Sequence, residues 1–182
     1  MKFAKIIKLL FSVIVCEVAG ASGAIFTTPQ IAEWYATLNK PFFNPPNWIF
    51  APVWTALFAL IGVSLYLVWE RKWEIRNEIC LPENRKINGL SEKFLSGAWK
   101  KANIVLIFIV QFALNVLWSY IFFGSHNIGA AFFELIMLWV AIVFTIVNFY
   151  RVSKVAAVLL LPYIIWVSFA GILNFSIWML NI

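Results

Sequence analysis

The chain has 182 residues, of which 63% are hydrophobic and only 12% are charged, and its mean hydropathy is +0.89. A soluble domain of this size could not bury so much apolar surface, so the composition excludes a soluble enzyme or binding module. The net charge of +6 does not indicate nucleic acid as a partner, because the basic residues lie between the apolar runs. Those runs have about the 20 residues that a helix needs to cross a bilayer. The sequence therefore predicts an all-α, multi-pass integral membrane protein.

Five spans are predicted, within one integral membrane domain that covers residues 1–182. They lie at 6–26, 47–69, 102–123, 128–150 and 155–180, and they are joined by an ordered loop at 27–46, a basic polar loop at 70–101 and two short turns. The polar loop has room for a short surface helix. Pro162 is expected to kink the fifth span, where neighbouring helices can satisfy the freed carbonyl.

The first span also resembles a signal peptide, because lysines precede it and small residues occur at 21–24, near its end. Its length and the presence of Glu17 favour a retained helix. Gly20 and Ala24 form a small-xxx-small pair, which allows close helix approach. Glu17 and Glu134 are carboxylates inside spans, where ionisable groups are costly. A role in proton handling and no direct role both remain open for them.

The stretch Trp34–Phe58 joins the first two spans and is rich in proline and aromatic residues. Pro41, Pro45 and Pro46 each lack a backbone donor and disfavour helix at the preceding residue, which predicts an extended, turning path. A helix can restart near Asn47, where Pro52 would lie in the first turns. Because so many aromatic side chains avoid water, we expect this loop to form an ordered lid over an apolar site.

Positive charge is distributed very unevenly between the two sides of the membrane. Every one of the 14 lysines and arginines except Lys40 lies at the N-terminus, in the 70–101 loop or in the turn at 151–154. With five spans these segments share one side. The positive-inside rule then predicts a cytoplasmic N-terminus and a lid on the outside, in the cell (inner) membrane of a bacterium.

Polar and aromatic residues share helix faces on three of the spans. These faces comprise Trp54 and Phe58 on the second span, Gln111, Asn115, Trp118 and Phe122 on the third, and Trp166, Ala170 and Asn174 on the fifth. Residues spaced by three or four positions lie on one side of a helix. The pattern predicts an apolar pocket between helices with a few hydrogen-bonding groups. Helix packing or an interfacial aromatic belt is the alternative interpretation.

Conventional catalytic and metal-binding signatures are missing from the sequence. His126 is the only histidine, and there is no aspartate, so neither a Ser-His-Asp triad nor a multi-histidine metal site can be built. Cys16 lies in the first span and Cys80 in the polar loop, so no disulfide is expected. The sequence predicts no metal and no required cofactor, and any catalysis must use the reactivity of the ligand.

Several motifs together resemble the tryptophan-rich sensory protein and translocator protein family, TspO/MBR, also known for peripheral-type benzodiazepine receptors. The lid reads Trp34-Tyr35-x3-Asn39-Lys40-Pro41-x3-Pro45-Pro46, and the second span reads Pro52-Val53-Trp54-Thr55-x-Leu57-Phe58. The third span contains Gln111-x3-Asn115-x2-Trp118, and the fifth contains Leu161-Pro162-Tyr163-x2-Trp166-x2-Phe169-Ala170. The resemblance covers nearly the whole chain.

The resemblance implies a five-helix bundle, commonly a homodimer, that binds tetrapyrroles such as protoporphyrin IX and benzodiazepine-type ligands under the first long loop. The residues implied to contact the ligand are Trp34, Tyr35, Trp54, Phe58, Gln111, Asn115, Trp118, Trp166 and Ala170. It further implies that Trp54 and Trp166 are the pair involved in light- and oxygen-dependent porphyrin breakdown. Such chemistry would belong to the ligand rather than to acid–base side chains.

Two features depart from the family pattern. Leu173-Asn174 is followed by Phe175, and no lysine or arginine follows, so sterol binding at this C-terminal motif is not expected. A generic sterol pattern does occur at Val147-x2-Tyr150-x3-Lys154. The 71–101 connection is also longer than expected of the family, which indicates a solvated insertion or an extra interaction surface.

A tetrapyrrole-binding receptor or sensor is the first interpretation of function. A porphyrin-degrading enzyme is the second. A transporter of porphyrin or other amphipathic molecules is third, because the sequence lacks the inverted repeat and paired broken helices of many transporters.

Overall fold

The computed structural model describes residues 2–70 and 86–182, with side chains at 3–70 and 102–182. The described elements are all helical: α1 (Lys2–Ala32), α2 (Trp34–Thr37), α3 (Phe50–Glu70), α4 (Lys86–Ser119), α5 (Ile128–Val152), α6 (Lys154–Leu159) and α7 (Leu161–Leu180). A 3-10 turn, Asn47–Ile49, precedes α3, and a π-helical turn, Tyr120–Gly124, continues α4.

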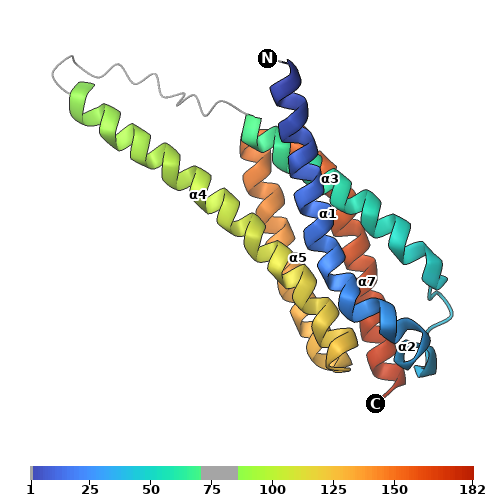
Figure 1. Cartoon of the computed structure of the whole chain (residues 1–182). Coiled ribbons are helices and arrows are strands. Elements are labelled where there is room, and N and C mark those ends of the chain that lie inside the picture. The colour runs from blue at the N-terminus through green and yellow to red at the C-terminus, as the bar shows by residue number, and fades with distance from the viewer. Residues whose placement is uncertain (1, 71–85) are drawn as a thin grey trace.

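Five of the described helical stretches are long and apolar enough to cross a membrane. They are Phe3–Ala32, Asn47–Glu70, Ala102–Gly124, Ile128–Val152 and Lys154–Leu180. This confirms the predicted all-α, five-span bundle. α1 packs against α3 and α4, and α5 packs between α4 and α7. The N-terminus lies at one end of the bundle, and α2, the lid and the C-terminus lie together at the other (Figure 1).

α1 and α3 cross closely where Ser12, in the N-terminal half of α1, meets Gly62, in the C-terminal half of α3. The Ser12 hydroxyl donates a hydrogen bond to the Gly62 carbonyl oxygen over 2.8 Å, and both residues are buried. A Cβ atom on Gly62 would lie only 2.6 Å from the Val13 Cα atom, so the missing side chain lets the two backbones touch. From this crossing α3 separates from α1 toward the lid end of the bundle (Figure 1).

Two boundaries differ from the sequence prediction. α1 continues past the predicted end at residue 26 and includes Pro29, so the first part of the predicted 27–46 lid is helical. A proline inside a helix removes one hydrogen bond, which neighbouring helices in a membrane bundle can compensate. α4 begins at Lys86, within the predicted 70–101 loop, because no proline interrupts 86–119. The rest of that predicted loop, 71–85, lies outside the described residues.

The fifth span consists of two helices rather than one kinked helix. α6 ends at Leu159 and α7 begins at Leu161, so Pro162 lies in the first turn of α7. Proline has no N–H to donate, and this turn is where the missing donor costs least. The buried Ser64 hydroxyl donates to the Ala156 carbonyl oxygen over 2.7 Å and ties α6 to α3.

We predict that Gly62→Ala destabilises the bundle by about 1–3 kcal/mol, because the added methyl group meets backbone that can move only if α1 and α3 separate. The measurement is thermal unfolding in detergent micelles. Gly171→Ala is the control, since its new methyl group would meet only the Leu135 side chain, at 3.2 Å. Equal losses for the two variants would contradict the proposed tight crossing.

Candidate functional site: a cavity under the lid

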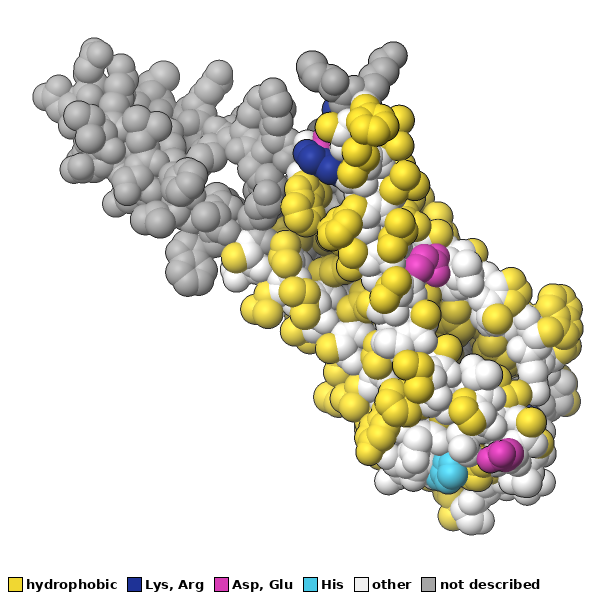
Figure 2. Space-filling view, in the orientation of Figure 1, with side chains coloured by type: hydrophobic (Ala, Val, Ile, Leu, Met, Phe, Trp, Pro, Cys, Tyr) yellow, Lys and Arg dark blue, Asp and Glu magenta, His cyan; other side chains and the backbone are white. Residues whose placement is uncertain are grey.

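A cavity of about 320 Å³ lies between α1, α3, the end of α4 and α7, and it extends to Tyr35 in α2. Its volume is at the lower end of the range of roughly 300–1,000 Å³ typical of small-molecule sites. Hydrophobic side chains cover most of the visible face, and the surface is hollowed beside α1 (Figure 2). The cavity follows from the divergence of α3 from α1 below their crossing.

Tryptophan side chains from three helices line this cavity. Trp54 of α3 stacks on Phe58 with ring centroids 5.3 Å apart, which confirms that these residues share one helix face. Trp118 of α4 stacks on Phe122 of the following π-helical turn, with centroids 5.2 Å apart.

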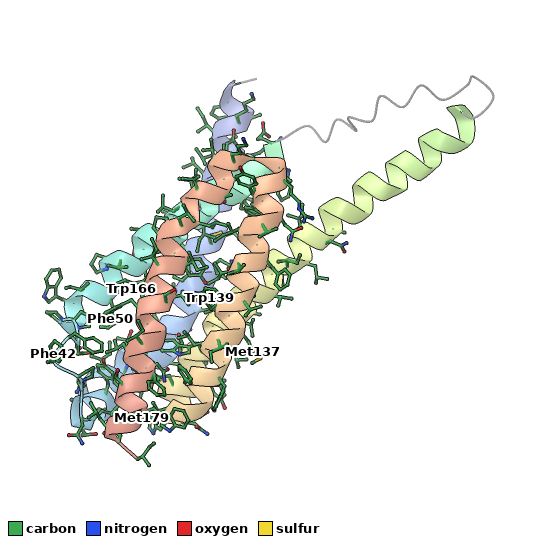
Figure 3. The ribbon with its side chains drawn as sticks, turned by 180° about the vertical axis from the view of Figure 1, so that it is seen from behind. Phe42, Phe50, Met137, Trp139, Trp166 and Met179 are labelled. Carbon is green, nitrogen blue, oxygen red and sulfur yellow. The ribbon has the colours of Figure 1, made fainter. Side chains whose placement is uncertain are left out.

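Trp166 of α7 meets Phe50 of α3 edge to face at 6.0 Å, and the two rings lie side by side (Figure 3). Both residues line the cavity, as do Trp54 and Trp118. Offset and edge-to-face contacts favour the binding of a further flat aromatic group.

Asparagine side chains supply the hydrogen bonds that hold the cavity wall. The Asn115 amide donates to the Tyr163 hydroxyl oxygen over 3.1 Å. The Trp118 indole donates to the Asn174 carbonyl oxygen over 3.1 Å, and the Asn174 amide donates to the Ile128 carbonyl oxygen over 2.9 Å. These bonds fix the orientation of Trp118 between α4 and α7, so the wall is preorganised.

The lid is pinned to the C-terminus by a reciprocal pair of hydrogen bonds. The Asn39 backbone N–H donates to the Asn181 side-chain oxygen, and the Asn181 amide donates to the Asn39 carbonyl oxygen, both over 2.9 Å. The Tyr35 hydroxyl donates to the Asn44 side-chain oxygen over 2.7 Å, while Lys40 Nζ lies 4.9 Å from the centroid of the Tyr35 ring. The lid is therefore held both by a bond within it, between Tyr35 and Asn44, and by the bonds between Asn39 and the C-terminal Asn181.

The Tyr35 hydroxyl stays protonated at neutral pH. Burial raises its pKa to about 12, although the hydrogen bond to Asn44 opposes the shift. The hydroxyl therefore remains a hydrogen-bond donor to the lid throughout the physiological range.

All of the residues predicted to contact a ligand line the cavity except Trp34 and Gln111. Trp34 stacks on His126 with centroids 4.3 Å apart and supports the cavity from outside. Trp34 and Tyr35 both pack against Phe122, with ring centroids 5.4 and 6.2 Å away, but of the two only Tyr35 reaches the cavity lining. Gln111 lies one turn of α4 away from Asn115 and is only 1% exposed, outside the cavity lining.

Of all the helices, α1 contributes the most cavity-lining residues that the sequence did not predict. Glu17, Gly20, Ala24 and further residues of this helix line the cavity, and Phe50 of α3 was also missed. The small-xxx-small pattern on α1 is the signal in the sequence that these residues could line a cavity, but by itself it predicts only close helix approach. In the structure Gly20 lines the cavity and also allows the ring of Phe58 on α3 to approach α1 closely.

We predict that Asn181→Ala loosens the lid without unfolding the bundle, because it removes both hydrogen bonds to Asn39. Backbone amide hydrogen exchange over 38–46 should accelerate by about tenfold, the effect expected for a net loss of about 1–1.5 kcal/mol. Asn148→Ala is the matched control, since the Asn148 amide donates only to the Phe144 carbonyl oxygen on its own helix. Unchanged exchange in the lid would show that these bonds do not hold it.

Comparisons with known proteins agree with this architecture. The TspO/MBR family model matches residues 12–179. A tryptophan-rich protein TspO from Archaeoglobus fulgidus is 39% identical, covering 97% of this chain and 98% of the relative. The human translocator protein is 35% identical over 86% of this chain and 79% of its own length. A tryptophan-rich sensory protein from Cereibacter sphaeroides is 30% identical over 88% of this chain and 87% of its own length. The chain therefore belongs to the TspO/MBR family of multi-pass membrane proteins.

Proposed function

We propose that this protein is a membrane receptor or sensor that binds a tetrapyrrole, such as protoporphyrin IX, in the cavity under the lid. The observation that carries the proposal is that Trp54, Trp118 and Trp166, from three different helices, line one preorganised cavity. A flat aromatic macrocycle gains both apolar burial and ring contacts in such a site. The name of the Cereibacter sphaeroides relative, a sensory protein, supports a receptor role.

The size and charge of the cavity limit how a porphyrin can bind. At about 320 Å³ the cavity is small, but exposed residues of α1 and α3 line it, so one edge of a macrocycle can project between these helices. Among the residues whose side chains are described, no lysine, arginine or histidine lines the cavity. The porphyrin carboxylates should therefore point out of it toward the lid end, where they keep contact with water.

The proposal has three further parts, which rest on the charge distribution, the family resemblance and the residues present. The protein lies in the cell (inner) membrane of a bacterium with its N-terminus in the cytoplasm and its lid outside, as the positive-inside rule requires. It acts as a homodimer, as is common in the family. It needs no metal or other cofactor to bind its ligand.

We predict that Trp166→Ala weakens binding of protoporphyrin IX by at least about tenfold, which corresponds to about 1.4 kcal/mol. The measurement is saturable quenching of tryptophan fluorescence in lipid nanodiscs. Trp139→Ala is the control, because Trp139 lies on α5, outside the cavity lining, and its indole donates to Ser168. Absence of saturable binding to the folded wild-type protein would refute the proposed function.

Light- and oxygen-dependent porphyrin degradation is a second candidate, favoured by the position of Trp54 and Trp166 on the cavity wall. In that case molecular oxygen oxidises the excited porphyrin, and the indoles relay electrons. We predict that illuminating the complex in air bleaches the porphyrin absorption band, and that Trp54→Phe and Trp166→Phe slow the bleaching more than they weaken binding. A rate no faster than that of porphyrin in empty nanodiscs would exclude this activity.

A further inference from the structure

Within the described part of the chain, the cavity lining contains one carboxylate and no basic group. Among its lining residues only Glu17 and Tyr35 have ionisable side chains, and the Tyr35 hydroxyl is engaged with Asn44. Glu17 lies near the middle of the Phe3–Ala32 span and is half-buried. A charged side chain at that depth is costly unless it is paired. The cavity thus presents an acidic group at a place where the surroundings cannot stabilise it well.

Glu17 has no partner within the part of the chain whose side chains are described. No hydrogen bond or ion pair reaches its carboxylate from residues 3–70 or 102–182. Lys8, on the same helix, is engaged with Glu70 over 2.8 Å. Nine residues of α-helix separate Lys8 from Glu17, a distance of about 13 Å along the axis, so Lys8 cannot neutralise it. A counter-charge for ionised Glu17 would therefore have to come from outside this set of residues, for example from a bound ligand.

The surroundings of Glu17 leave room for a ligand. Gly20, Ala21 and Ala24 follow it at i+3, i+4 and i+7, so the same face of α1 carries only small residues beside the carboxylate. Gly20 contacts the ring of Phe58, which places an aromatic wall within one helical turn of Glu17. A cationic group here would meet both a carboxylate and an aromatic face.

The cavity is open sideways between α1 and α3, toward the region that lipid occupies. Exposed residues from both helices line it, namely Ala21, Ala24 and Thr28 on α1 and Ala51 and Thr55 on α3. A lipophilic cation dissolved in the bilayer can therefore reach Glu17 without crossing the lid. The small, uncharged side chains at this opening offer no competing ionic site.

We propose that Glu17 is a specificity-determining residue of the cavity, which selects flat aromatic amphipaths that carry a positively charged nitrogen. The inference rests on the same cavity as the proposed function and extends its ligand class. The carboxylate pairs with the cation while Trp54 and Phe58 contact the ring system. Glu17 offers no ionic partner to an anionic group in the same place, which favours a porphyrin orientation with its carboxylates away from α1.

Two probes of nearly identical shape separate charge from stacking. N-methylacridinium carries a permanent positive charge on nitrogen, and 9-methylanthracene replaces that nitrogen with carbon. Binding of each is measured by tryptophan fluorescence quenching in phosphatidylcholine nanodiscs, which carry no net charge. Glu17→Gln removes the charge and keeps the shape, Glu17→Asp keeps the charge, and Glu33→Gln removes an exposed acid that does not line the cavity.

The expected result is that Glu17→Gln weakens N-methylacridinium binding by about tenfold and changes 9-methylanthracene binding less than about twofold, as pairing with a desolvated cation requires. Glu17→Asp should retain a preference for the cation, and Glu33→Gln should behave as wild type. Equal effects of Glu17→Gln on both probes, no effect on either, or no binding of the cation to wild type would each overturn the proposal.

Protoporphyrin IX distinguishes this inference from the proposed function. If the charge preference is correct, Glu17→Gln binds the porphyrin about as tightly as wild type, since no ion pair between Glu17 and the porphyrin is lost. Failure of wild type to bind porphyrin, together with charge-dependent acridinium binding, would reject the tetrapyrrole proposal and keep the role of Glu17. If the wild type binds porphyrin but Glu17→Gln affects the binding of N-methylacridinium and 9-methylanthracene equally, the role of Glu17 is rejected and the tetrapyrrole proposal is kept.

Discussion

The close contact between α1 and α3 at Gly62 sets the geometry of the bundle and of the cavity. Because Gly62 has no side chain and accepts a hydrogen bond from Ser12, the two helices touch in the N-terminal half of α1. Straight helices that touch at one end and cross at an angle must separate at the other. That separation leaves the space that Trp54 and Trp166 line under the lid.

The lid turns this open space into a preorganised site. Its proline-rich path cannot pair with itself as regular structure, so its order depends on contacts with distant parts of the chain. Asn39 bonds to Asn181 at the C-terminus, and Tyr35 bonds to Asn44 within the lid. Ordering the lid before binding lowers the entropy that a ligand must overcome.

Polar groups inside the bundle fall into two classes. The Asn115 and Asn174 side chains are hydrogen-bonded across helices and fix the cavity wall. Gln111 and Glu134 are 1% and 2% exposed, and no described residue bonds to their side-chain polar atoms. Unpaired buried groups destabilise a fold. Glu17 differs from both classes because it faces the cavity, where a ligand can supply the missing partner.

Hydropathy and i, i+4 spacing are local properties of the chain, so the sequence alone predicts five spans, a proline-rich lid between the first two, and the shared face of Trp54 and Phe58. It could not determine how each helix is rotated about its axis or where two helices cross. Those choices left Trp34 and Gln111 outside the cavity lining and brought Tyr35 and Glu17 to its wall. Only the tertiary structure decides them, because they depend on side-chain packing between segments far apart in the chain.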